Sequence, residues 1–291
     1  MENKVDQAVI LMGGLGTRFL PATKIIAKEM FPIGSKPAVM YHLEELYQSG
    51  IKNVYIIVSK KKKNVAEFFK RDKKLERSLK NLHREHMLDE YNEILNKMTI
   101  KIIIQGKLNG SGGAIYYAKK YTKDKPFALI LGDDLCKAEK GKLPAIGQLC
   151  KAYEKTGKTV IGVKQFSIEV VPRYSSVVIG KKISSKSNEV LDIIEKPKNP
   201  PTNLVGLARY VLTSDIFDEI LKCPKFENDE LRFTDALTAL SKQGKVVSCE
   251  FDARYYDCGN KLEYTKCLID FALEDKEIRP KLKEYLKERS K

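Results

Sequence analysis

Short apolar runs alternate with helix-forming segments through the first half of the chain, and this alternation constrains the fold more than any other feature. The runs lie at residues 8–12, 54–59, 100–104, 128–131 and 159–163, and each stops at a glycine or a polar residue. Runs of this length and composition are typical of buried strands. Strands that alternate with helices form βαβ units, so we predict an α/β fold with a mainly parallel sheet and helices on both faces.

Helical spacing of apolar residues fills the intervals between these runs. We predict helices at 41–48, near 113–121 and at 143–155, with one or two more in 64–97. His42 lies in the first of these helices, and we expect it to be structural.

The second half of the chain is richer in strands. We predict strands at 176–179, 190–194, 205–211 and 246–251, and helices at 215–221, 234–242, 261–273 and 276–289. We find no internal repeat and no linker, so we expect one domain over residues 1–291, whose second half contributes residues to the same cleft. In an open parallel sheet that cleft lies beyond the carboxyl ends of the strands.

The composition of the 291 residues, 43% hydrophobic and 31% charged, is that of a globular chain with a sizeable core. No apolar run approaches the roughly 20 residues of a membrane-spanning helix. The N-terminal segment has an acid before its short apolar run and nothing like a cleavage site after it. The six cysteines form no CxxC pair, so we expect reduced thiols and neither a disulfide framework nor a zinc site. We therefore expect a cytoplasmic protein without a membrane partner.

The formal net charge of +15 has three interpretations: a solvated lysine-rich surface, attraction of anionic small molecules, or nucleic-acid binding. The sequence contains no zinc-finger spacing, no RNP signature and no arginine-rich stripe, so we expect no nucleic-acid partner. The densest cationic run, at 60–63, follows a predicted strand, and we expect it in a loop or at a helix start.

A glycine-rich turn follows the first strand, in the segment 13–18 (GGLGTR). Glycines at this place let backbone N–H groups approach a phosphate, although a tight turn without a ligand has the same pattern. The segment is not a Walker loop, because no Gly-Lys-Ser/Thr closes it, and Phe19 stands where a dinucleotide-binding loop needs its third glycine. Two cations, Arg18 and Lys28, supply charge of the kind that a triphosphate needs.

Two carboxylates follow strand-like stretches. Asp133 comes after the run 128–131, and Asp257 follows a stretch farther along the chain. Mg²⁺ is commonly held by one or two carboxylates, with phosphate and water oxygens as its other ligands. An aspartate at a strand end also starts turns and caps helices, so the pattern alone leaves both interpretations open.

The strand at 190–194 runs into Glu195, Lys196 and Pro197. The carboxylate can accept hydrogen bonds from sugar hydroxyls, and the ammonium can pair with a phosphate. Successive strand side chains point to opposite faces, so both serve one ligand only if the strand ends there and the chain turns, as Pro197 favours. A neighbouring Glu–Lys pair is also common on protein surfaces.

The N-terminal segment GGLGTRFLPATKIIAKEMFPIGSKP resembles the signature of sugar nucleotidyltransferases, in the form seen in bacterial UTP–glucose-1-phosphate uridylyltransferases. Further motifs agree with that family in order and spacing, and the resemblance covers about residues 5–273. These motifs are Gln105…Gly110, Leu131-Gly132-Asp133-Asp134, Glu195-Lys196-Pro197, Ala208-Arg209-Tyr210-Val211-Leu212, Leu231-Arg232-Phe233-Thr234-Asp235-Ala236 and Asp257-Cys258-Gly259-Asn260-Lys261.

The resemblance implies the fold of the nucleotide-diphospho-sugar transferases, a Rossmann-like mixed, mainly parallel sheet flanked by helices, with a small β-rich sugar-binding part. Within it, residues 5–165 would form a nucleotide-binding half, 166–273 a sugar-phosphate-binding half and 274–291 a helical C-terminal tail. The implied reaction transfers uridylyl from UTP to α-D-glucose 1-phosphate with the help of Mg²⁺. A homodimer or homotetramer is expected.

The same resemblance implies roles for particular residues. It assigns catalysis to Arg18, Lys28 and Lys196, nucleotide binding to Gly13, Gly14, Gly16, Thr17, Gln105 and Gly110, sugar-phosphate binding to Glu195, Lys196 and Ser175, and the metal to Asp133 and Asp257. Asp134 is the less suitable ligand, since relatives often carry another residue there. Ser175 and Ala208 replace glycines that are usual in the family. Another hexose or nucleotide, or a regulatory role without catalysis, therefore stays open as an alternative.

Overall fold

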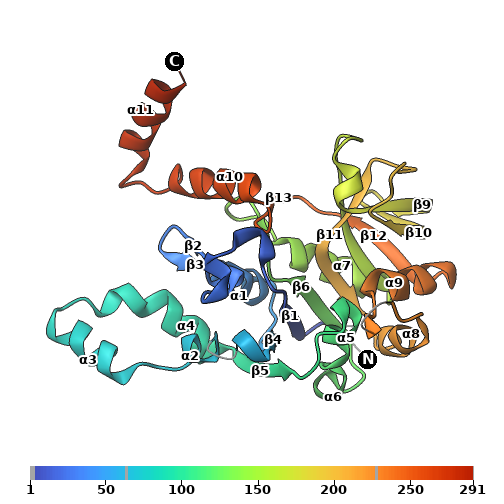
Figure 1. Cartoon of the computed structure of the whole chain (residues 1–291), viewed down its shortest axis with the longest axis horizontal. Coiled ribbons are helices and arrows are strands. Elements are labelled where there is room, and N and C mark those ends of the chain that lie inside the picture. The colour runs from blue at the N-terminus through green and yellow to red at the C-terminus, as the bar shows by residue number, and fades with distance from the viewer. Residues whose placement is uncertain (1–3, 63–64, 227–228, 291) are drawn as a thin grey trace.

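The computed structural model describes residues 4–62, 65–226 and 229–290, which are built around a nine-stranded sheet (Figure 1). The strand order is β5, β4, β1, β6, β11, β8, β12, β10, β9. The strands are β1 Gln7–Met12, β4 Asn53–Ser59, β5 Thr99–Gln105, β6 Phe127–Leu131, β8 Thr159–Gln165, β9 Ser175–Ser184, β10 Ser187–Glu195, β11 Leu204–Leu212 and β12 Val246–Glu250.

Seven of these strands run in one direction, and β10 and β11 run in the other. β5, β4, β1 and β6 are parallel neighbours: Ala8 of β1 pairs with Val54 on one side and with Ala128 on the other. β11 lies antiparallel between β6 and β8, and β8 and β12 are again parallel. The prediction of a mixed, mainly parallel sheet is confirmed, and the sheet continues without a break from the first half of the chain into the second.

Helices pack on both faces of the sheet because strand side chains alternate between the faces. In β1, Ala8, Ile10 and Met12 belong to one apolar core, and Val9 belongs to the other. The first core takes its helical residues mainly from α1 Ala38–Gln48 and α7 Ala145–Thr156. The second takes them from α5 Gly110–Tyr116, α8 Ile216–Lys222 and α9 Phe233–Lys242.

The helical segments 64–97 and 113–121 are more divided than expected. The first contains three short α-helices among its described residues, α2 Val65–Phe68, α3 Lys73–Asn81 and α4 Asp89–Lys97, and the second divides into α5 and α6 Lys119–Thr122. Asp72 begins α3, because its carboxylate accepts hydrogen bonds from the N–H groups of Lys74 and Leu75. Helical spacing of apolar residues marks a buried face but not the point at which a helix breaks.

Two short antiparallel pairs of strands were not predicted from the sequence. β7 Asp134–Lys137 pairs with β13 Arg254–Asp257, with Asp134 opposite Asp257. β2 Pro32–Ile33 pairs with β3 Lys36–Pro37. Since β7 follows β6 after a single turn, the β7–β13 pair holds the segment around Asp257 at the carboxyl end of the main sheet.

The chain ends in α10 Lys261–Ala272 and α11 Arg279–Arg289, and α11 projects away from the rest of the molecule (Figure 1). None of the helices in the described part of the chain has the length and apolar character needed to cross a membrane.

Candidate active site

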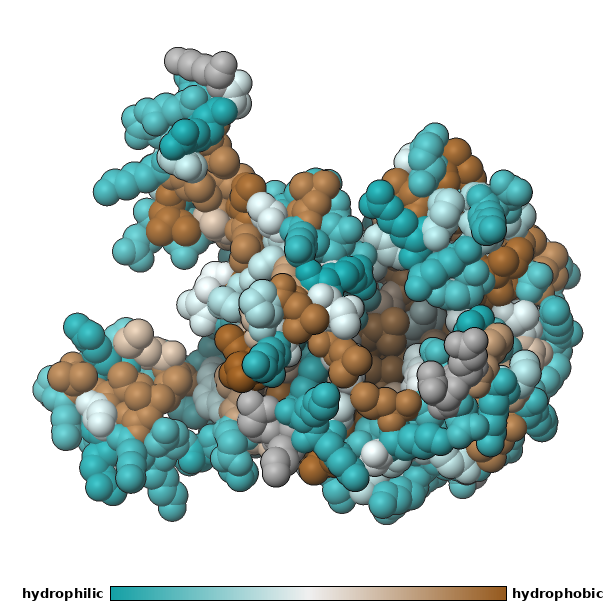
Figure 2. All heavy atoms as spheres, viewed as in Figure 1, coloured by the Kyte–Doolittle hydropathy of each residue, from teal (hydrophilic) through white to brown (hydrophobic). Residues whose placement is uncertain are grey.

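Two cavities lie beyond the carboxyl ends of the parallel strands and meet at β6. The first, of about 450 Å³, is lined by the turn after β1, the end of β5 and the start of α5. The second, of about 500 Å³, is lined by residues that follow β6, by the ends of β10 and β13, and by β11. Leu131 and Asp133 line both. Figure 2 shows the surface hollowed at this place, near β6 and β11 of Figure 1.

Two larger cavities, of about 710 and 670 Å³, lie beside the loop at 137–144. Neither is lined by a residue that the sequence analysis assigns to the site. Size alone therefore does not find the place where the predicted residues gather.

Four of the predicted nucleotide-binding residues line the first cavity: Gly13, Gly14, Gln105 and Gly110. Gln105 is buried at the end of β5, and an added Cβ at Gly13 would lie 2.9 Å from its Oε1. Gly110 has a φ of +83°, and a Cβ there would lie 2.5 Å from the carbonyl oxygen of Leu231. Gly110 is therefore required by its backbone conformation and by the Leu231 backbone, whereas a side chain at Gly13 would displace the Gln105 amide.

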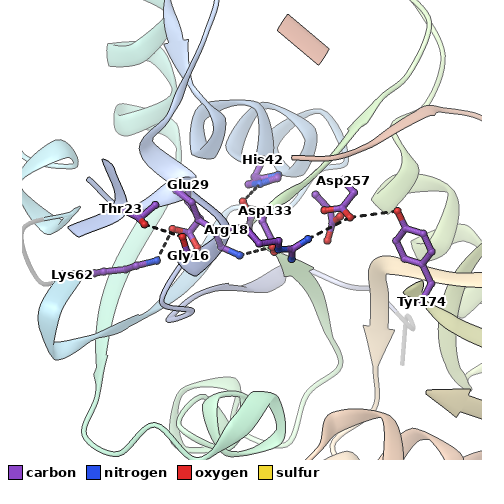
Figure 3. Close-up of polar contacts among 12 residues, drawn as sticks. Gly16, Arg18, Thr23, Glu29, His42, Lys62, Asp133, Tyr174 and Asp257 are labelled. Carbon is purple, nitrogen blue, oxygen red and sulfur yellow. Dashed lines mark hydrogen bonds and ion pairs between the residues drawn. The ribbon is translucent and has the colours of Figure 1, made fainter. Parts of the chain in front are cut away.

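Gly16 and Thr17 are not among the residues that line either of these two cavities. Gly16 has a φ of +67° and turns the chain into a short 3₁₀ helix, Thr17–Phe19. Its carbonyl oxygen accepts a hydrogen bond of 2.8 Å from the Thr23 hydroxyl (Figure 3). Gly16 thus shapes the turn that carries Arg18.

An ion pair stands where the two cavities meet. The Lys28 ammonium contacts the Asp133 carboxylate. Burial by itself would lower the pKa of Lys28, but the charges of Asp133 and Glu29 raise it above its ordinary value. Burial would raise the pKa of Asp133, but Lys28 lowers it below its ordinary value. Both groups therefore stay charged at neutral pH, which suits contact with a phosphate and a metal.

Asp257 lies beside Asp133, although the two are far apart in the sequence. A Cβ added at Gly259 would lie 2.7 Å from Asp133 Oδ2 and 3.0 Å from Asp257 Oδ1. It would also lie 3.0 Å from Arg18 Nη2. The three side-chain ends surround one point, which a larger residue than Gly259 would disturb.

Asp257 has weaker partners than Asp133. Arg18 Nη1 lies 3.9 Å from Asp257 Oδ2, and the Tyr174 hydroxyl donates to the same oxygen at 3.4 Å (Figure 3). Burial raises the pKa of Asp257, the Arg18 charge opposes that effect and the Asp133 charge adds to it, so the net pKa is above the ordinary value. A further cation beside Asp257 would therefore stabilise the charged form of its carboxylate.

The two carboxylates fit a divalent cation. Among the described residues, no three or more Asp, Glu, His or Cys side chains gather into a metal-binding group. A site with only two protein carboxylates suits Mg²⁺, which takes its remaining oxygens from phosphates and water. Asp134 has a different partner, because its carboxylate accepts a hydrogen bond from the Tyr255 hydroxyl. Burial, together with the charges of Asp133 and Asp257, raises the pKa of Asp134 well above its ordinary value.

Glu195 and Lys196 both line the second cavity. β10 ends at Glu195, and Lys196 has a φ of +44°, so the chain leaves the strand geometry between them. The N–H of Lys196 donates to the carbonyl oxygen of Tyr174 at 2.9 Å. The condition that the sequence analysis set for one shared ligand, a strand end followed by a turn, is met.

Ser175 and Ala208 also line the second cavity. Ser175 pairs with Glu195 across β9 and β10, and both Ser175 and Ala208 are buried. The Ser175 hydroxyl oxygen lies 3.0 Å from the place where a Cβ of Gly206 would stand. The two side chains that replace the usual glycines therefore belong to the wall of this cavity.

Glu29 lines the first cavity beside Lys28 and was not predicted from the sequence. Its Oε2 accepts a hydrogen bond of 2.8 Å from the Lys62 ammonium (Figure 3), while its buried Oε1 has no hydrogen-bond partner among the described residues. Lys62 comes from the cationic run at 60–63, and it is buried. An acid next to the signature lysine was the only sequence signal for Glu29, and nothing distinguished Lys62 from its neighbours.

Comparison with known proteins agrees with this arrangement. The sequence model of the family described as nucleotidyl transferase matches residues 7–272. A UTP–glucose-1-phosphate uridylyltransferase of Staphylococcus saprophyticus is 38% identical over 286 residues, which is 98% of each chain. That of Bacillus subtilis is 35% identical, over 97% of this chain and 96% of its own. The chain therefore belongs to the nucleotidyl transferase family.

Solved structures agree as well. The UTP-bound enzyme of this kind from Acinetobacter baumannii superimposes with a TM-score of 0.88 at 28% identity, covering 97% of this chain and 98% of that one. A UDP-glucose pyrophosphorylase in complex with UDP-glucose gives a TM-score of 0.85 at 28% identity, over 93% of this chain and 100% of the other.

Proposed function

We propose that the protein transfers uridylyl from UTP to α-D-glucose 1-phosphate, giving UDP-glucose and pyrophosphate. The observation that carries the proposal is the pair of cavities that meet at Asp133. One cavity has glycine-rich backbone and a buried amide, as a nucleotide needs, and the other has an exposed ammonium beside a carboxylate, as a sugar phosphate needs. The two reactants would then meet at the shared wall.

In this proposal a phosphate oxygen of the sugar phosphate attacks the α-phosphorus of UTP in line, and pyrophosphate leaves from the opposite side. No side-chain nucleophile is required, because positioning and charge neutralisation supply the catalysis. Lys28 and Arg18 neutralise charge that develops on the leaving pyrophosphate. Asp133 and Asp257 would hold Mg²⁺, which when bound supplies further positive charge at the phosphate oxygens.

The remaining residues position the two substrates. Gln105 would read the uracil edge, since an amide offers one donor and one acceptor. Lys196 would pair with the 1-phosphate, and Glu195 would accept hydrogen bonds from the sugar hydroxyls. Gly13 and Gly14 would leave room for the triphosphate at the backbone.

We assign the nucleotide to the half at 5–165 and the sugar phosphate to the half at 166–273, with 274–291 as a tail. The projection of α11 away from the molecule, with Ile278 and Tyr285 exposed, supports a homodimer or homotetramer that covers it. The described cysteines are all free thiols, which supports a reducing compartment such as the cytoplasm.

The test measures pyrophosphate release by the full chain with each nucleoside triphosphate against glucose, galactose and N-acetylglucosamine 1-phosphates. We expect UTP and glucose 1-phosphate to give the highest kcat/KM. A preference for another hexose is the second candidate, which Ser175 and Ala208 in the second cavity favour. If no pair of substrates gives pyrophosphate release, the enzymatic function is rejected in favour of a regulatory role. A salt-dependent titration with DNA or RNA tests whether the positive charge serves nucleic-acid binding.

A further inference from the structure

His42 lies fully buried on α1, behind the loop that carries Asp133. Its Nε2 is 3.0 Å from the carbonyl oxygen of Gly132, the residue before Asp133 (Figure 3). Its Nδ1 is 3.4 Å from Nη2 of Arg209. A guanidinium can only donate, so Nδ1 accepts and the ring proton is on Nε2. His42 therefore donates a hydrogen bond to the Gly132 carbonyl.

The orientation of the imidazole is itself fixed by a buried ion pair. Arg209 is fully buried in β11, and its Nε and Nη2 donate to the Glu45 carboxylate at 3.0 and 2.8 Å. Glu45 also accepts a hydrogen bond of 3.0 Å from the N–H of Ile146. Burial, together with the Arg209 charge, lowers the pKa of His42 to about 3, so the ring stays neutral.

Gly132, the residue before Asp133, is held at both of its backbone polar groups. The N–H of Gly132 donates to the carbonyl oxygen of Leu11 at 3.0 Å, and its own carbonyl accepts from His42. A Cβ at Gly132 would lie 2.7 Å from the same Leu11 oxygen. β1 and α1 thus fix, from two sides, the backbone from which the Asp133 side chain departs.

We propose that His42 is a positioning residue that holds the Gly132–Asp133 peptide so that the Asp133 carboxylate faces Asp257. No atom of His42 lines either cavity, so it acts only through Gly132. The inference concerns this backbone, and it rests on the proposed function only where it extends to the metal.

Three variants of the full chain separate positioning from packing. His42→Leu keeps an apolar group in the core but removes both hydrogen bonds. His42→Gln keeps an amide that can donate to Gly132 and accept from Arg209. Val39→Ala, one turn earlier on α1 and equally buried, removes core packing without touching the network, and it is the matched control for lost stability.

The first readout is amide hydrogen exchange, without metal, in a peptide that spans residues 131–135. We expect His42→Leu to exchange roughly tenfold faster than the wild type, because a carbonyl that fixes the loop loses its donor. His42→Gln and Val39→Ala should stay near the wild-type rate. The second readout is Mn²⁺ binding measured by electron paramagnetic resonance, for which His42→Leu should bind about 10- to 100-fold more weakly and His42→Gln should recover most of the affinity.

Unchanged exchange in His42→Leu, or equal acceleration in His42→Leu and Val39→Ala, would overturn the proposal. Faster exchange with unaltered Mn²⁺ affinity would also overturn it, because the carboxylate would then not depend on the peptide. If the wild type binds no Mn²⁺, the metal assignment of the proposed function fails, while the exchange comparison still decides the role of His42.

Discussion

In the first cavity the Lys28 side chain is 13% exposed and contacts Asp133, whereas in the second the Lys196 side chain is 66% exposed and its Nζ lies 3.7 Å from Glu195. The side chains of Lys28 and Asp133 are already paired and largely desolvated, so binding of a phosphate requires little reorganisation of water or side chains. Lys196 has its full hydration to lose and its side chain to order. The first cavity, which we propose for the nucleotide, is therefore preorganised, and the second, which we propose for the sugar phosphate, would be completed by its ligand.

The largest effect is expected from the carboxylates at the shared wall. Asp133→Asn and Asp257→Asn should each lower kcat by about three orders of magnitude, which corresponds to roughly 4 kcal/mol of transition-state stabilisation. Steady-state rates at saturating Mg²⁺ measure this loss. Asp134→Asn is the matched control, since Asn still accepts from the Tyr255 hydroxyl and should leave the rate within a few-fold. Near-native rates in both main variants would remove the metal assignment.

The two cations that we propose to contact the triphosphate come next: Lys28 lines the first cavity, and Arg18 lines the second, beside Asp257. Arg18→Ala and Lys28→Ala should each lower kcat by about 30- to 1,000-fold, because a charge-assisted contact to the leaving group contributes roughly 2–4 kcal/mol. They should differ in stability: Arg18 is 59% exposed, so its loss should leave the melting temperature unchanged. Lys28→Ala leaves the buried Asp133 carboxylate unpaired and should lower the melting temperature. An effect on UTP affinity alone would indicate ground-state binding only.

For Glu195 and Lys196, which line the second cavity, the expected change is in KM. Lys196→Ala should raise KM for every hexose 1-phosphate by about tenfold, since it reads charge, which corresponds to roughly 1.4 kcal/mol. Glu195→Gln should penalise sugars according to their hydroxyl pattern. The specificity constants for glucose, galactose and N-acetylglucosamine 1-phosphates distinguish the two. Equal losses for all three sugars in Glu195→Gln would contradict the assignment.

The carboxyl groups of Asp133 and Asp257 should also be protonated at different pH values. The pKa of Asp133 is below and that of Asp257 above the ordinary value, so acid protonates Asp257 first. As the pH falls, kcat/KM should decline with an apparent pKa above that of a free aspartate, about 3.9. Because Mg²⁺ competes with the proton, raising its concentration should move this decline to lower pH. A decline that is independent of Mg²⁺ would place the controlling group elsewhere.

Ser175→Gly should have the smallest effect. The serine side chain belongs to the wall of the second cavity, so its removal should improve the use of glucose 1-phosphate by no more than a few-fold or leave it unchanged. The kcat/KM for glucose 1-phosphate, compared with galactose 1-phosphate, measures it. A strong loss for glucose 1-phosphate would mean that the hydroxyl itself binds the sugar.

Much of this arrangement follows from the sequence. The buried strands are visible as apolar runs, and their carboxyl ends meet at one edge of the sheet, so residues such as Asp133 and Gln105 can be assigned to that edge from the sequence alone. A single ligand can be predicted for Glu195 and Lys196, because the proline that follows them marks the end of the strand. These inferences need only local pattern and the geometry of a parallel sheet.

Other features depend on contacts between distant segments. The four-residue strands of the β7–β13 pair are too short to show a period, yet their register brings Asp257 to Asp133. Gly259 is constrained by groups from three separate segments, which no local pattern reveals. The same holds for Lys62, which differs from Lys60 and Lys61 only in what the fold places opposite its side chain.

The buried ion pairs have a consequence for association kinetics. Lys28, Lys62 and Arg209 each face a carboxylate in the interior, so these pairs cancel and add little to the field outside. The net charge of +15 is therefore carried almost entirely by the surface. Both proposed substrates are anions, and such a field speeds their diffusional encounter with the protein. Mobile ions screen this long-range attraction but hardly reach the buried pairs, so salt should slow capture of the substrates while leaving the step that follows nearly unchanged.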